Sequence, residues 1–91
     1  MEEFGDSAFF YCKSLKNVSL PEGLKVIGAY CFKQSGLLEI NVPKTVKKIF
    51  KEAFNECTKL KKVSPLKNVE VGEDAFPAHL RGKIIISLDI P

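Results

Sequence analysis

Apolar and small residues recur along this chain in a pattern that repeats about every 22 residues. Four segments, starting at positions 4, 27, 49 and 71, each read apolar residue, glycine, two polar or small residues, a small residue and phenylalanine. The third segment has Phe50 in place of the glycine. The starts are 23, 22 and 22 residues apart, and a fixed period of this length is typical of solenoid proteins. Each repeat of such a protein packs against its neighbours.

A second block follows each segment. It reads Cys12-x-x-Leu15-x-x-Val18-x-Leu20-Pro21 in the first unit, Gln34-x-x-Leu37-x-x-Ile40-x-Val42-Pro43 in the second, and Cys57-x-x-Leu60-x-x-Val63, then Pro65-Leu66, in the third. The pattern becomes irregular after Phe76. We therefore predict one array, residues 1–91, of about four units: 4–26, 27–48, 49–70 and 71–91.

The second block predicts short strands. Val18 and Leu20 are two residues apart, so both point to one face of an extended strand, whereas Asn17 and Ser19 point to the other. Stacked units bring equivalent strands side by side, about 4.8 Å apart, into a parallel sheet. The polar residues of the opposite face are the candidate partner-binding residues: Asn17, Ser19, Glu39, Asn41, Lys62 and Ser64.

The first block predicts a turn on the opposite side of each coil. Asp6, Glu52 and Asp74 precede the small residue and phenylalanine, as in a short helical or 3₁₀ turn that opens with an acidic residue. Four phenylalanines at equivalent positions are expected to stack inside the solenoid: Phe9, Phe32, Phe54 and Phe76. The glycines of this block are expected at positions that need a positive φ or close packing.

The combined pattern, I-G-x-x-A-F-x-x-C-x-x-L-x-x-V-x-L-P, resembles the BspA-like leucine-rich repeats over residues 4–91. Departures are Cys31 in the small-residue slot, Gln34 in the Cys slot and Phe50 in the Gly slot. The resemblance implies a leucine-rich-repeat solenoid of the right-handed β/α superhelix type. Its strands would form one sheet, with helical or 3₁₀ turns and loops opposite. It also implies a secreted or cell-surface protein that acts in adhesion and protein binding.

The three cysteines are predicted to be reduced core residues. Cys12 and Cys57 hold the same slot two units apart, or about 9–10 Å, which exceeds the roughly 7 Å limit between the Cα atoms of a disulfide. His79 completes no zinc spacing with them, so no metal or cofactor is expected. A catalytic pair of Cys57 and His79, one coil apart, is the alternative. No third residue is placed to orient it, so we do not expect an enzyme.

Net charge is +3, but the lysines are unevenly distributed. Eight lie between residues 44 and 67, against Glu52 and Glu56: Lys44, Lys47, Lys48, Lys51, Lys59, Lys61, Lys62 and Lys67. One explanation is a polyanionic partner. The other is that lysines at the exposed positions of each repeat keep the protein soluble. We favour solubility, because Arg81 is the only arginine and the phenylalanines are assigned to the core. Nucleic acid is therefore not the expected partner.

Composition leaves the location and the array length open. Hydrophobic residues make up 45% of the chain, but no apolar run is long enough to span a membrane. The acidic start, Met-Glu-Glu, is unlike a signal peptide. Neither end looks capped, so we expect part of a longer array. The alternatives are a cap formed by residues 77–87 and end-to-end self-association.

These observations predict a non-enzymatic module that presents a sheet surface to a protein or glycan partner. A structural scaffold repeat inside an intracellular protein is the second hypothesis, favoured by the reduced cysteines.

Overall fold

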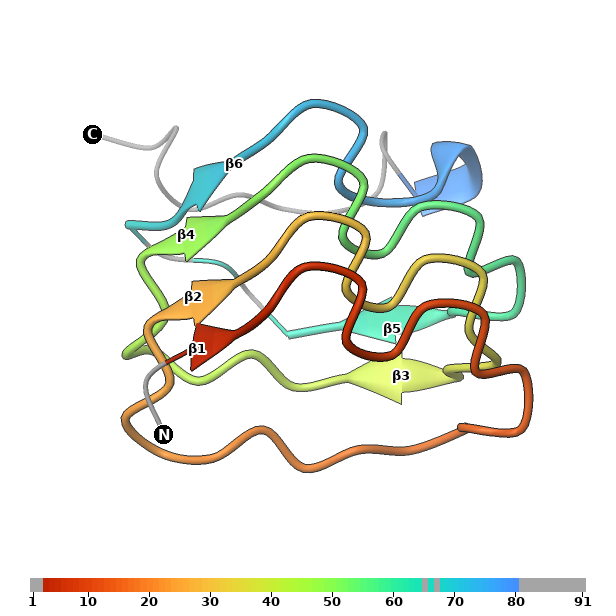
Figure 1. Ribbon diagram of the computed structural model, residues 1–91, viewed down its shortest axis with the longest axis horizontal. Helices are drawn as coiled ribbons and strands as arrows, with labels where there is room; N and C mark the ends of the chain where they lie inside the picture. The colour runs from red at the N-terminus through yellow and green to blue at the C-terminus, as the bar shows by residue number, and fades with distance from the viewer. Residues whose placement is uncertain (1–2, 65, 67, 81–91) are drawn as a thin grey trace.

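The computed structural model describes residues 3–64, 66 and 68–80, and the chain winds through them in stacked coils (Figure 1). Each coil contributes one two-residue strand to a parallel sheet. The strands are β1 (Glu3–Phe4), β2 (Val26–Ile27), β4 (Lys48–Ile49) and β6 (Glu70–Val71), and they lie side by side in that order. Their register advances by one repeat from strand to strand, so one period of the sequence is one coil of a solenoid.

A second parallel sheet pairs β3 (Glu39–Ile40) with β5 (Lys62–Val63), to the right of the first in Figure 1. The prediction of strands in this part of each unit is confirmed for the second and third units, but the prediction of a single sheet is wrong. The four-stranded sheet was missed because each of its strands crosses a boundary assigned between units, at 3/4, 26/27, 48/49 and 70/71. In the first unit, the Lys16 carbonyl still accepts the Leu38 N–H at 3.0 Å.

Consecutive turns replace the helical turns predicted between the two sheets. The residue two positions before each phenylalanine has a positive φ: 58° at Ser7, 58° at Tyr30, 54° at Glu52 and 53° at Asp74. A residue in the left-handed region ends a right-handed helix, so the segment forms i to i+3 turns instead. The 3₁₀ helix η1 (Ala78–Leu80) lies after Phe76. The described residues contain no α-helix, so the β/α superhelix type is not confirmed.

The predicted phenylalanine ladder is confirmed. Ring centroids are 5.1 Å apart for Phe9 and Phe32, 5.2 Å for Phe32 and Phe54, and 5.2 Å for Phe54 and Phe76, with nearly parallel planes. Phe32 and Phe54 are fully buried. The ladder therefore stacks one large apolar side chain of every coil along the axis of the solenoid.

Two of the glycines at the second position of a unit, Gly28 and Gly72, are required by close packing rather than by a positive φ. A Cβ atom on Gly28 would lie 2.7 Å from the backbone nitrogen of Asp6, and one on Gly72 would lie 2.6 Å from that of Lys51. Real Cβ atoms essentially never approach so closely. The backbone of each unit therefore passes directly over the preceding unit at this point.

Between the Cys slot and the next leucine, the second unit is one residue shorter than the first and third, and the structure places this gap at Gly36. Gln34 shares its positive φ with Tyr11 and Glu56, which directly precede Cys12 and Cys57. Ser35, rather than Gln34, therefore occupies the Cys slot, which corrects the alignment. Ser35 is buried, and its Oγ lies 3.4 Å from Cys57 Sγ.

Candidate functional site

The candidate residues lie on the outer face of the β3/β5 sheet and its continuation into the first unit. Five are exposed and define the outer sheet face: Asn17, Ser19, Glu39, Asn41 and Lys62. Glu39 pairs in register with Lys62, while Ile40 and Val42 point inward and are buried. Alternation along the strands thus places polar side chains over an apolar layer. Whether these residues bind a partner stays a prediction.

Ser64 differs from the other candidates. It is half-buried, and its Oγ accepts the Val42 N–H at 2.8 Å. This bond satisfies a backbone donor beyond the end of β3 and ties the second unit to the third. Ser64 therefore supports the outer sheet face, while the five exposed residues form it.

A hollow of about 250 Å³ opens at one end of the outer sheet face. Ser19 and Asn41 line it from neighbouring units, together with Val18, Leu20, Glu22, Val42 and Pro43. Its volume is below the roughly 300–1,000 Å³ of ordinary small-molecule sites. The hollow can accept a side chain of a partner, and polar groups at its rim can orient that side chain.

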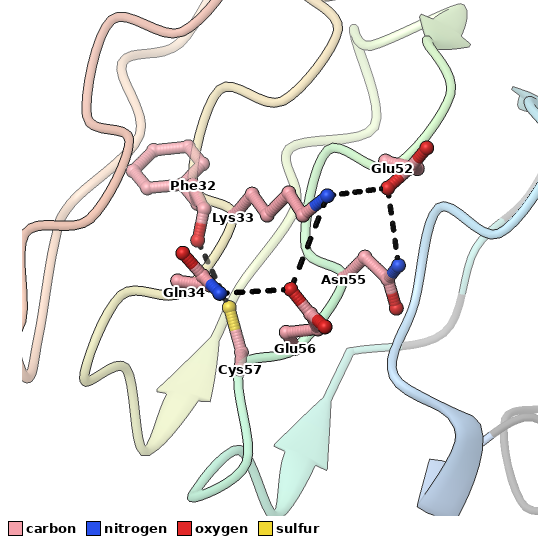
Figure 2. Close-up of polar contacts among 7 residues, drawn as sticks. All are labelled: Phe32, Lys33, Gln34, Glu52, Asn55, Glu56 and Cys57. Atoms are coloured by element: carbon pink, nitrogen blue, oxygen red, sulfur yellow. Dashed lines mark hydrogen bonds and ion pairs between the residues drawn. The ribbon is translucent and has the colours of Figure 1, made fainter.

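A polar network on another side of the coils joins the second and third units (Figure 2). Lys33 Nζ lies 2.7 Å from Glu52 Oε1 and 3.9 Å from Glu56 Oε1. Glu52 Oε1 also accepts a hydrogen bond from Asn55 Nδ2, and Glu56 Oε1 accepts one from Gln34 Nε2. The bond from Lys33 lowers the pKa of Glu52, and the same bond raises the pKa of Lys33. The network therefore fixes two neighbouring coils relative to each other.

Sequence reasoning missed this network, although a signal for it was available. Residues one period apart occupy equivalent positions in adjacent coils, so opposite charges about 19–23 residues apart are candidates for contact. Lys33 and Glu52 are 19 residues apart, and Gln34 and Glu56 are 22 apart.

The cysteines form no disulfide, and two of them are buried as predicted. Burial raises the pKa of the Cys31 thiol to about 11 and also raises the pKa of Cys57. Cys57 Sγ donates a hydrogen bond to the Phe32 carbonyl at 3.0 Å (Figure 2). Cys12 is half-buried, so the prediction of three core thiols is wrong for this one.

His79 does not pair with Cys57. Its Nε2 lies 2.7 Å from the Leu60 carbonyl, while the Cys57 thiol has Phe32 and Ser35 as partners. A raised pKa also keeps the Cys57 thiol protonated, whereas a nucleophilic cysteine requires the thiolate. The geometry therefore gives the catalytic alternative no support.

The lysines of residues 44–67 are divided between different sides of the solenoid. Lys48 belongs to β4 of the four-stranded sheet, where it lies 3.7 Å from Glu70, whereas Lys62 belongs to β5 of the second sheet. Lys67 lies outside the described residues. Lys48 and Lys62 therefore lie in different sheets rather than side by side.

Residues 3–64, 66 and 68–80 contain neither a candidate metal cluster nor a candidate membrane-spanning helix. No group of three or more His, Cys, Asp or Glu side chains is placed to hold a metal ion there. No helix in this part of the chain is long and apolar enough to cross a membrane.

Comparison with protein families identifies the repeat. Residues 1–89 match the family model of the BspA-type leucine-rich repeat region, which is built from six copies of the repeat. No curated protein and no solved structure matches the chain.

Proposed function

The chain belongs to the BspA-type leucine-rich repeat family, and from this premise we propose that it is a non-enzymatic binding module. It presents the outer sheet face to a protein or glycan partner in an adhesion-type interaction. Repeat families of this kind are often used for protein binding, because stacked coils create an extended and nearly continuous surface.

The arrangement of the outer sheet face carries this proposal. Its side chains come from three successive coils: Glu39 and Lys62 belong to the paired strands β3 and β5, and Asn41 lies between the buried residues Ile40 and Val42. Rigid elements hold interacting groups more accurately than loops do. The face also combines an amide, a hydroxyl and both charges, a composition suited to hydrogen bonding with a polar partner surface.

Two alternatives rest on weaker observations. A structural scaffold repeat inside an intracellular protein is compatible with three free thiols, since reducing compartments keep cysteines reduced. A polyanion-binding surface through residues 44–67 is disfavoured by the division of those lysines between the two sheets.

The proposal is tested by probing an array of purified extracellular proteins and glycans with the chain and two variants. Glu39→Arg combined with Asn41→Arg changes charge and volume at the centre of the outer sheet face. Lys25→Glu changes an exposed charge elsewhere and is the matched control. We expect at least one partner whose affinity falls about tenfold or more with the first variant and is kept by the control. Partners whose affinity is unchanged by the double substitution would show that binding uses another surface.

A further inference from the structure

A hollow at Gly36 results from the missing residue of the second unit. The first unit has Lys13 and Ser14 between its Cys slot and the next leucine, and the third has Thr58 and Lys59, but the second has Gly36 alone. A Cβ atom on Gly36 would collide with the Lys13 carbonyl oxygen. The shortened turn leaves a hollow of about 230 Å³, which we call the Gly36 hollow. Its walls come from three coils: Lys13, Lys16, Gln34, Ser35, Gly36, Glu56, Thr58 and Lys59.

The charge of the Gly36 hollow is positive. Three lysines line it, Lys13, Lys16 and Lys59, against the carboxylate of Glu56. Glu56 is already engaged, since Gln34 Nε2 donates to it at 2.9 Å and Lys33 Nζ lies 3.9 Å away. Within the described part of the chain, none of the three lining lysines forms an ion pair. Lys13 rests over the Tyr11 ring at 4.8 Å, a contact worth little at an exposed site.

A second hollow adjoins the first. The Leu38 hollow, of about 460 Å³, shares Thr58 and Lys59 with the Gly36 hollow. Leucines from three coils form its apolar lining: Leu38, Leu60 and Leu80. Lys61 and His79 stand beside them, so this hollow is apolar with a basic rim. Together the two hollows run along the coils beside the outer sheet face, because Lys16, Leu38 and Lys61 directly precede its residues Asn17, Glu39 and Lys62.

We propose that these hollows bind an acidic peptide segment of a protein partner, with carboxylates in the Gly36 hollow and an apolar side chain in the Leu38 hollow. The inference rests on the proposed binding function and specifies the chemistry of the partner. Unpaired ammonium groups attract carboxylates, and the leucine-lined wall gains from covering by an apolar side chain. Because the hollows share a wall, an extended peptide reaches from one to the other within a few residues.

The lining favours a peptide over other anionic polymers. Single-stranded nucleic acid is bound by stacking of its bases on aromatic side chains, and no Phe, Tyr or Trp lines either hollow. A sulfated glycan would use the lysines but would leave the apolar wall of the Leu38 hollow unfilled. The combination of a basic hollow and an apolar one therefore matches a segment in which acidic residues precede an apolar residue.

Titration of the ¹⁵N-labelled chain with a synthetic peptide, followed by NMR, tests this proposal. The probe has two glutamates, a glycine spacer and a leucine, with capped ends. We expect amide shifts at Gly36 and at residues 58–61. Replacing Lys16 and Lys59 by glutamate should weaken binding about tenfold, whereas the matched control Lys25→Glu should leave it unchanged. The amide spectrum of each variant shows whether its fold is intact.

Two altered probes separate the halves of the site. A peptide with glutamine for glutamate should lose the salt-dependent part of the affinity, and one with serine for leucine should lose shifts near Leu38. Equal binding of the serine peptide, or equally strong binding of a heparin oligosaccharide, would overturn the peptide assignment, since charge alone would then suffice.

Failure of this inference is distinguishable from failure of the proposed function. The inference alone would be overturned by two results together. Array partners would lose affinity on substitution of Glu39 and Asn41 but not on substitution of Lys16 and Lys59, and the peptide would cause no amide shift at Gly36. If no array partner depends on the outer sheet face, the proposed function fails, whatever the peptide does.

Discussion

The first unit and the two units after it contain nearly the same residue types, yet they are buried to different degrees. Phe32 and Phe54 are fully buried, whereas Phe9 at the equivalent position is half-buried. Leu15 and Leu37 differ in the same way. The second and third units have a described unit on each side, whereas the first has one on a single side. Burial in this fold is thus supplied by neighbouring coils rather than by a unit's own sequence.

The same substitution should therefore change the free energy of unfolding by different amounts in the first unit and in the interior units. In a solenoid, the free energy of a unit comes largely from its interfaces with its neighbours. A side chain that stacks between two coils therefore contributes more than the same side chain on an outer coil. Matched substitutions in the first and the interior units test this difference directly.

The largest effect is expected for Phe54→Ala. The ring stacks between Phe32 and Phe76 and is fully buried, so its loss leaves a cavity. The free energy of unfolding should fall by about 3–5 kcal/mol, measured by urea denaturation. Phe9→Ala is the matched variant, and we expect roughly half of that loss, because part of its ring already faces solvent. Equal losses would mean that the first coil is covered as fully as the interior ones.

A smaller effect is expected from adding a methyl group to the interior glycines. Gly28→Ala, in the second unit, would place a Cβ atom 2.7 Å from the backbone nitrogen of Asp6, so the first and second coils must separate. We expect a loss of about 1–3 kcal/mol, seen as a lower midpoint of thermal unfolding. Gly5→Ala is the matched variant in the first unit and should cost almost nothing, because no atom lies within 4 Å of its added Cβ. A large loss at Gly5 would contradict the contrast between the units.

Thiol labelling should distinguish the first unit from the interior units. Cys12 of the first unit is half-buried and should react with iodoacetamide in the folded chain, whereas Cys31 and Cys57 should react only on unfolding. Mass spectrometry after timed labelling identifies the modified residues. Simultaneous labelling of all three cysteines would show that the interior coils open as readily as the first.

The buried thiol also makes stability depend on pH. Burial raises the pKa of Cys31 from 9.0 to about 11, so the folded state keeps a proton that the unfolded state has lost. Stability is therefore unaffected below about pH 9 and falls as pH rises from there towards 11. Cys31→Ala, which restores the residue found at positions 8, 53 and 75, should reduce this slope. An unchanged slope in urea denaturation would assign it to other groups.

The sequence predicts the parts of this fold that recur with the repeat and have a clear pattern. The repeat period predicts the length of one coil, and the spacing of the phenylalanines predicts the ladder. Alternation of apolar and polar residues around Ile40 predicts which side chains of β3 point inward and which point outward. The β1–β2–β4–β6 sheet was missed because each of its strands is divided between the end of one predicted unit and the start of the next. The turns were misassigned because an acidic residue before alanine suits both a helical start and a left-handed position.

The candidate site was predictable in part. Strand parity identified the exposed side chains Asn17, Glu39 and Lys62, but the hydrogen bond of Ser64 to the next coil depends on where the strand ends. The Gly36 hollow was hidden by an alignment that placed Gln34 rather than Ser35 opposite Cys57. Counting from the phenylalanine instead of the leucine gives the observed slot.

The smallest effect is expected for Glu52→Gln, which removes the ion pair with Lys33 between the second and third units. The side chains are only partly covered, and exposed ion pairs contribute little. The bond from Lys33 lowers the pKa of Glu52 below its ordinary value of 4.5. The pair therefore stabilises the fold above that value, and its contribution disappears as pH falls through the folded pKa. Thermal unfolding at neutral pH should detect a small loss of stability that vanishes in 1 M salt. Glu73→Gln is the control and should cause no loss, because Glu73 is exposed and forms no ion pair within the described coils. A loss that persists in 1 M salt would contradict an ionic contribution of this pair to the contact between the two coils.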